Sequence, residues 1–326
     1  MLLPLFSLLS RGKLTVLLFH KVPQKPHCLV PDELDLAGFE RVLQTTMQLF
    51  RVIPLEDALM GLRNDKLPPR AACITFDDGY PDWLNGVVPI LERRGAHATF
   101  FITTGQFAGV PMWNERILHA INSAPEGLSP LSWEGFPSIT LGMRKDRPQN
   151  LQRLEAFLKY QEPATKEYLL VDLERHSGVD TAQVSTMSVN DLRNLHAKGF
   201  GIGGHSMTHP ILSRCTSKQA FEEIAGARET LESLIRGKVS GFAYPNGVPG
   251  KDFGSEHIEM VRHAGYSYAV TTQRGFAAAH TSPLQIPRFT PWGPTPWRMD
   301  VQFLRNLLYA GHTLTENDGP WTLSQK

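Results

Sequence analysis

The sequence predicts an α/β protein with a mainly parallel sheet, because strand-like and helix-like segments alternate along most of the chain. Short apolar runs such as 71–76 alternate with stretches such as 36–50, whose apolar residues recur at helical spacing. Roughly seven or eight such strands suit either a βα barrel or an open doubly wound sheet. No glycine-rich phosphate motif follows the first strand, which weakens a dinucleotide-binding fold.

The first part of the chain supplies three of the expected strands, at 14–20 (LTVLLFH), 71–76 (AACITF) and 97–103 (HATFFIT). These runs are apolar and rich in β-branched or aromatic residues, as buried strands are. Two helices are expected between them, at 36–50 and 83–95. The second helix ends at Gly95, a residue that commonly terminates helices.

The later part of the chain continues the alternation. Strands are expected at 200–205, 239–245, 266–272 and 284–289, and helices at 188–199, 217–237 and 257–265. Ser188 with Asp191 three residues later approximates a capping box, and Gly199 closes that helix. Parallel strands joined in this way require right-handed crossovers through the helices.

The stretch 105–187 interrupts this rhythm. It contains several prolines, two tryptophans and one helix-like piece, NLQRLEAFLKYQ. We expect an insertion between two βα units of one domain covering 1–326, because the stretch offers too few contiguous apolar elements for a core of its own.

Composition excludes several classes of protein. The 326 residues carry a formal net charge of +1, so no overall field attracts nucleic acid. Three cysteines without regular spacing argue against a disulfide framework.

The first residues, MLLPLFSLLSRGK, form a short apolar segment. It is too short to span a bilayer and lacks the charged start and cleavage site of a secretion signal. It could lie on a membrane surface or pack against the barrel. We therefore expect a cytoplasmic protein and leave peripheral membrane association open.

Polar residues gather at the predicted strand ends, which meet at one face of a βα barrel. Asp77 and Asp78 stand side by side after strand 71–76, and His205 and His209 follow strand 200–205. If the turn between the histidines is helical, both imidazoles can reach one ion. One added carboxylate completes a two-histidine, one-carboxylate metal site with open positions.

Three motifs extend this argument: TFDDGY (75–80), HSMTHP (205–210) and FAYPNG (242–247). They resemble the first three motifs of the polysaccharide deacetylase family, also called the NodB-homology domain or carbohydrate esterase family four, over about residues 70–290. The resemblance implies a distorted (β/α) barrel of about seven strands. It also implies removal of acetyl groups from N-acetylated sugars with one divalent metal ion, commonly zinc, and hence a carbohydrate as partner.

The resemblance assigns roles to individual residues. Asp77 matches the catalytic base, and Asp78, His205 and His209 match the metal ligands. The backbone amide of Asn246, which follows the proline of the third motif, matches the donor that stabilises the oxyanion.

Tyr244 in the same motif could stack on a sugar or pack at a strand end, and the sequence favours neither. Trp113, Trp292 and Trp297 could likewise wall a sugar cleft or anchor the core.

The sequence departs from the common family pattern at three places. Ala243 stands where many members have an arginine, AVTT replaces the usual fourth motif, and QIPRF replaces the usual leucine and histidine of the fifth. The chain resembles a branch with YPxG and an arginine near the last strand. We therefore expect Arg288 beside Asp77, and we expect His20, at the end of the first strand, as the acid that protonates the leaving nitrogen.

Three functions remain open from the sequence. The first is deacetylation of N-acetylhexosamine units in a glycan or glycan precursor. The second is a related amidase or deformylase acting on a small or lipid-linked amide, which would use the same residues. The third is a non-catalytic carbohydrate-binding barrel, which would not need Asp77.

Overall fold

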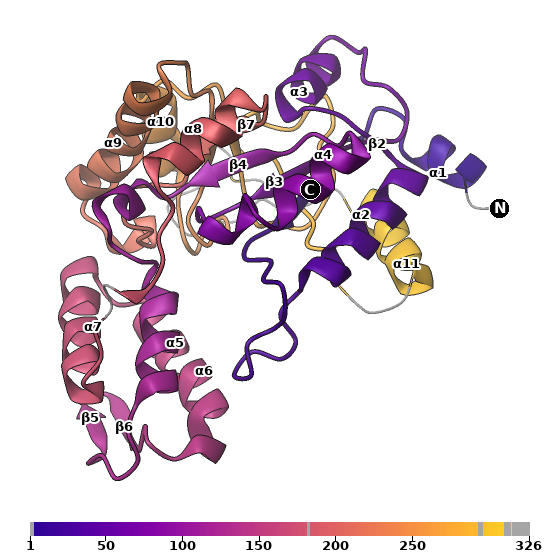
Figure 1. Cartoon of the computed structure of the whole chain (residues 1–326). Helices are drawn as coiled ribbons and strands as arrows, with labels where there is room; N and C mark the ends of the chain where they lie inside the picture. The colour runs from indigo at the N-terminus through magenta and orange to yellow at the C-terminus, as the bar shows by residue number, and fades with distance from the viewer. Residues whose placement is uncertain (1–2, 181–182, 293–295, 310–313, 315–326) are drawn as a thin grey trace.

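The computed structural model describes residues 3–180, 183–292, 296–309 and 314. A parallel sheet of seven strands forms its centre, with the order β1-β3-β4-β7-β8-β9 and the short β2 paired to β3 (Figure 1). The strands of this sheet are β1 (Thr15–Phe19), β2 (Arg51–Val52), β3 (Ala71–Phe76), β4 (Thr99–Ile102), β7 (Gly201–Gly204), β8 (Gly241–Ala243) and β9 (Tyr268–Val270).

Helices cover the outside of this sheet and connect its parallel strands (Figure 1). Large buried side chains such as Phe39, Phe100 and Phe242 fill the space between the sheet and these helices. The helices of this layer and of the two chain ends are α1 (Leu3–Leu9), α2 (Leu36–Leu49), α3 (Leu55–Arg63), α4 (Val87–Arg94), α8 (Val189–Ala197), α9 (Ser217–Ile235), α10 (Ser255–His263) and α11 (Pro296–Leu307).

The sheet curls, and the segment 284–289 lies between its two edge strands. Ile286 pairs with Val270 of β9, and Phe289 pairs with Leu17 of β1, both in parallel. The predicted last strand is therefore present as single bridges rather than as a continuous strand. The expected distorted barrel is confirmed in the form of a curled, barrel-like parallel sheet.

The alternation of side chains along β3 determines which of its residues face the inside of the curled sheet. Cys73 lies on the inner face of the curled sheet, in an apolar cluster with residues of β1, β4, β8 and β9. Because successive strand residues point to opposite faces, Thr75 and then Asp77 continue along the same inner face. The strand thus carries a carboxylate to the end of the inner core.

Most expected elements are confirmed, including the capping box of α8, in which Ser188 and Asp191 bond each other's backbone N–H. Three parts of the structure were not expected from the sequence: β2 with α3 in 51–63, the helix α1, and α11 after the last bridge. These pieces are short or lie outside the regular βα repeat, so periodicity alone did not distinguish them from loops.

The insertion corrects one expectation, because it has a hydrophobic core of its own. It contains α5 (Trp113–Ser123), α6 (Arg147–Lys159), α7 (Pro163–Ser177) and the hairpin of β5 (Leu131–Trp133) with β6 (Phe136–Ile139). Ile117, Leu154 and Leu173 belong to a buried cluster built almost entirely from this lobe. The prediction failed because the apolar residues are spread over three helices and converge only when α5 packs against α6 and α7 (Figure 1).

Candidate metal centre and catalytic cleft

Asp77 and Asp78 diverge at the end of β3 because the backbone turns sharply between them. Asp78 and Gly79 have φ values of 88° and 98°, a region that non-glycine residues rarely adopt. The Gln106 side chain fixes this turn, because its Nε2 donates to the Asp78 carbonyl at 2.6 Å. Two neighbouring carboxylates can therefore serve different partners.

The turn 205–209 brings two histidines to Asp78, although it is not helical as the expectation required. Ser206 and His209 instead have φ values of 62° and 59°, in the left-handed region. The two imidazole rings end 4.8 Å apart between centroids. The left-handed turn thus achieves what a helical turn was expected to achieve.

The side chain of Glu223 on α9 fixes the turn 205–209 by hydrogen bonds. Its Oε2 accepts the backbone N–H groups of Met207 and Thr208 at 2.7 and 2.8 Å, and its Oε1 accepts the Thr208 hydroxyl at 2.6 Å. Gly203 and Gly204 before the turn pack so closely that a Cβ at either would collide with Phe101 or Tyr266. The histidines are therefore positioned by a strand, a helix and a braced turn.

Asp78, His205 and His209 form a set of donors that fits a metal ion. The Asp78 Oδ1 lies 3.3 Å from Nε2 of His205 and 3.4 Å from Nε2 of His209. Donor atoms around a tetrahedral zinc ion, each about 2.1 Å from it, lie roughly 3.4 Å from one another. This buried Asp78 oxygen has no hydrogen-bond partner among the described residues. A buried carboxylate oxygen without a partner is expected where a metal ion binds.

The protonation of the two imidazoles also suits metal binding. Nδ1 of His205 lies 2.8 Å from the Ala243 carbonyl, so the ring can donate there and direct a lone pair on Nε2 toward Asp78. Burial lowers the pKa of His209 to about 3, which keeps that imidazole neutral. For His205 burial opposes a charge, but Asp77 and Asp78 outweigh it and raise the pKa. The two carboxylates thus favour a positive charge at this position, and a bound metal ion would supply it in place of the proton on His205.

Arg288 pairs with Asp77 in two parallel hydrogen bonds. Its Nη1 and Nη2 donate to Oδ1 and Oδ2 of Asp77 at 2.7 and 2.6 Å, and both side chains are buried. Burial tends to raise the pKa of Asp77, but the Arg288 charge outweighs it and leaves the pKa lowered. Nε of Arg288 donates to the Thr271 carbonyl and Nη1 to the Thr75 hydroxyl, which fix the guanidinium.

A cleft of about 630 Å³ opens above these groups. His20, directly after β1, and Asn246, after β8, both line it together with the two aspartates and two histidines. Among the described residues, the backbone N–H of Asn246 donates to no acceptor. It is therefore available to a ligand, and the left-handed φ of 59° at Asn246 is the kind of backbone strain that often marks a functional site.

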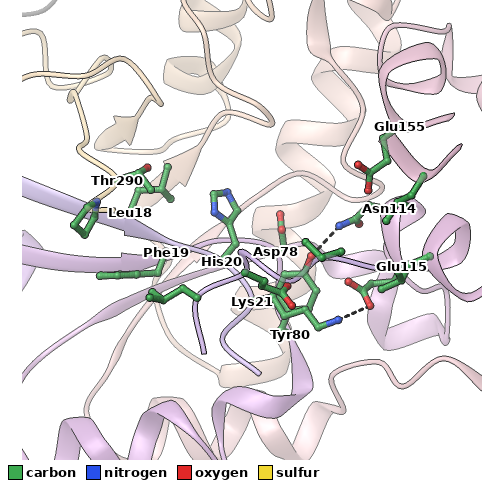
Figure 2. Close-up of a pocket in the computed structure, with 16 residues that line it drawn as sticks. Leu18, Phe19, His20, Lys21, Asp78, Tyr80, Asn114, Glu115, Glu155 and Thr290 are labelled. Carbon is green, nitrogen blue, oxygen red and sulfur yellow. Dashed lines mark hydrogen bonds and ion pairs between the residues drawn. The ribbon is translucent and has the colours of Figure 1, made fainter. Parts of the chain in front are cut away.

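The insertion forms one wall of this cleft. Trp113 and Asn114 of α5 and Glu155 of α6 line the same cavity as the histidines. A neighbouring cavity of about 350 Å³ shares His20, Asp78 and Glu155 and continues along the lobe. Figure 2 shows His20 beside Asp78 in this second cavity, with Lys21 bonded to Glu115 at 2.7 Å and Asn114 bonded to Tyr80 at 3.1 Å.

The comparisons with known proteins agree with this arrangement. A family model described as polysaccharide deacetylase matches residues 64–135 and 158–269, together more than half of the chain. This chain belongs to the polysaccharide deacetylase family. The match includes both metal motifs and omits 136–157, so it is interrupted within the insertion.

Individual relatives of this deacetylase-family chain are distant. YxkH of Bacillus subtilis, which is named as a polysaccharide deacetylase, is 18% identical over 267 residues, covering 82% of this chain and 67% of that protein. The Streptococcus pyogenes deacetylase PplD with acetate has a TM-score of 0.59 at 16% identity, with 90% and 98% of the chains covered. IcaB from Ammonifex degensii has a TM-score of 0.57 at 18% identity, with 91% and 97% covered. These structural similarities support the fold.

Not every residue singled out in the sequence faces the cleft. Tyr244 is fully buried, its ring stacks on Phe253 at 3.8 Å, and its hydroxyl donates to the Leu284 carbonyl. This placement corresponds to the packing alternative and not to sugar stacking. Of the three tryptophans, Trp113 lines the cleft, whereas Trp292 and Trp297 are exposed and are not among its lining residues.

Sequence reasoning missed the residues that brace the site from behind. Gln106 and Glu223 hold the Asp78 and histidine turns, yet neither belongs to a quoted motif. Glu223 lies in an ordinary amphipathic helix, so no local pattern distinguishes it from a surface carboxylate.

Proposed function

We propose that this protein is a metal-dependent hydrolase that removes acetyl groups from N-acetylated sugars of a polysaccharide or glycan precursor. The observation that carries the proposal is the convergence of Asp78, His205 and His209 beside an Asp77 that is paired with Arg288. A deacetylase needs both parts, because a metal ligand and a proton acceptor must lie next to each other.

The donor set fits zinc, the ion we propose, since two imidazole nitrogens and one carboxylate oxygen leave room for water and substrate. A bound divalent ion would lower the pKa of water to about 7 and polarise the acetyl carbonyl. Asp77 accepts the proton of the attacking water. Arg288 keeps Asp77 ionised and fixes the direction of its carboxylate.

Two further groups complete the reaction on the proposed path. The Asn246 backbone N–H donates to the oxygen on which negative charge develops as water attacks. The leaving nitrogen needs a proton, because an amide anion is too basic to depart at neutral pH. His20 lines the cleft together with the two aspartates, and its imidazole can supply that proton.

Purified protein loaded with zinc and incubated with N-acetylated chito-oligosaccharides tests the proposal. We expect release of acetate and about one ion per chain. A zinc-loaded protein that binds the oligosaccharide and releases no acetate would favour a carbohydrate-binding barrel. Release of formate or another acid from small or lipid-linked amides, with chito-oligosaccharides left intact, would favour the related amidase.

A further inference from the structure

The outward face of α11 is unusually apolar for a surface helix. Trp297 and Val301, one helical turn apart, are 63% and 42% exposed, and Leu308, directly after the last residue of the helix, is 68% exposed. Arg298 and Arg305 lie on the same outward side. A helix that merely covers a core normally presents polar residues to water.

The inward side of α11 shows that this orientation is fixed. Phe303 is fully buried and packs against Phe50 and Phe289, with ring centroids 5.1 and 5.5 Å apart. The buried Asn306 donates to the Gly275 carbonyl at 3.1 Å. The helix therefore cannot rotate to hide its apolar stripe without losing these contacts.

The helix α1 enlarges the same surface. Its Phe6 packs against Phe50, the residue that also contacts Phe303, so α1 and α11 share one anchor. Nζ of Lys13, just after α1, donates to the Leu307 carbonyl at the end of α11. Leu3 and Leu8 of α1 are 46% and 67% exposed. Two neighbouring helices thus present leucines, a valine and a tryptophan to the outside.

The charges on this surface are mostly positive. Arg11 follows α1 and is exposed, as are Arg298 and Arg305. Asp300, the one acid within α11, is only partly exposed. A matching partner must accept apolar side chains and carry negative charge.

We propose that this surface docks onto an anionic lipid bilayer; it is defined by Leu3 and Leu8 of α1, Trp297 and Val301 of α11, and Leu308 directly after α11. Tryptophan and leucine beside arginine are the combination that amphipathic helices use at the lipid interface. No helix among the described residues is long and apolar enough to cross a bilayer, so the contact would be peripheral. Thr290 lines both the cleft and the neighbouring cavity, six residues before α11 begins at Pro296.

Flotation of the full chain with lipid vesicles tests this proposal without any assay of activity. We expect binding to vesicles that contain phosphatidylglycerol, and weaker binding to pure phosphatidylcholine or at high salt. The double variant Trp297→Ser, Leu308→Ser should lower the partition coefficient roughly tenfold or more, because both side chains insert in the interface. Arg298→Gln with Arg305→Gln should lower binding to the anionic vesicles only.

Tyr168→Ser is the matched control, because Tyr168 is 69% exposed on α7 of the insertion, away from this surface. Equal binding by wild type and the Trp297, Leu308 variant, equal loss in the Tyr168 variant, or equal affinity for both vesicle types would overturn the proposal. So would light scattering that shows a dimer dissociated by Trp297→Ser, since the surface would then belong to a second copy. Circular dichroism of each variant checks that the fold is retained.

Discussion

Asp77 and Arg288 place two opposite charges inside the curled sheet, where both side chains are almost completely shielded from solvent. The side-chain exposures are 2% for Asp77 and 0% for Arg288. A buried pair of this kind contributes little against a well-packed apolar pair, but removing one member leaves the other charge uncompensated. The pair therefore specifies the position and ionisation of the carboxylate beside the proposed metal.

Replacing Arg288 by methionine should destabilise the metal-free protein by about 3–5 kcal/mol at neutral pH, because Asp77 is left buried and unpaired. Urea unfolding measures this loss. In an Asp77→Asn background the same substitution should cost clearly less, since no charge remains to be stranded. Equal costs in the two backgrounds would show that the pair is not coupled.

His20 is the proposed acid, and its removal should separate amide from ester substrates. His20→Ala should lower turnover on N-acetyl sugars by roughly 10²-fold to 10⁴-fold while metal occupancy stays unchanged. An O-acetyl substrate should suffer less, because an alkoxide leaves more readily than an amine anion. N-deacetylation at the wild-type rate would reject His20 and direct attention to Asp77 as both base and acid.

At the scale of elements, the metal ligands depend on how α9 braces the turn after β7. Glu223 accepts three hydrogen bonds from Met207 and Thr208, and this turn carries both histidines. Groups that orient metal ligands usually affect metal affinity nearly as strongly as the ligands themselves.

Glu223→Met should therefore weaken zinc binding roughly 10- to 100-fold, measured by competition with a chelating dye. Methionine has a similar length but offers no oxygen to accept the N–H groups and the hydroxyl that the carboxylate accepts now. Glu222→Met is the matched control, because Glu222 precedes it on the same helix and is 61% exposed. A zinc affinity that changes equally in both variants would show that the brace does not matter.

The helix α6 places Glu155 in the cleft wall at a cost in stability. Burial, and then the nearby charge of Glu115, raise the pKa of Glu155 from its ordinary value of 4.5 to about 7. Because the folded state keeps this proton longer than the unfolded chain, stability falls as pH rises between these two values.

Glu155→Gln should remove the part of the pH dependence of stability that Glu155 causes. The thermal midpoint of the variant should therefore change less between about pH 4.5 and pH 7 than that of wild type. Glu134→Gln, at an exposed position of the hairpin in the same lobe, should behave as wild type. A variant whose midpoint follows the wild-type curve at every pH would refute the assignment.

At the scale of the molecule, the regular βα repeat was predictable and the irregular parts were not. Local patterns such as the Ser188 capping box and the apolar run 71–76 determine their own elements. The segment 284–289 was expected as a strand because of its composition, yet the curl of the sheet allows it only single bridges.

The candidate site likewise has a part that the sequence predicted and a part that it did not. Asp77, Asp78, His205 and His209 stand in short motifs, so sequence could place them at strand ends, and the structure brings them together in one cleft. The core of the insertion and the braces Gln106 and Glu223 depend on contacts between distant segments, which a single sequence does not reveal.

The separate roles of two adjacent carboxylates are the centre of this account, and one paired measurement tests them. Zinc content and acetate release are determined together for Asp77→Asn and Asp78→Asn. We expect Asp77→Asn to retain about one zinc ion and to lose turnover by roughly 10² to 10⁴, because asparagine cannot accept the proton. Asp78→Asn should lose both zinc and activity. Loss of zinc in Asp77→Asn with zinc retained in Asp78→Asn would contradict the account.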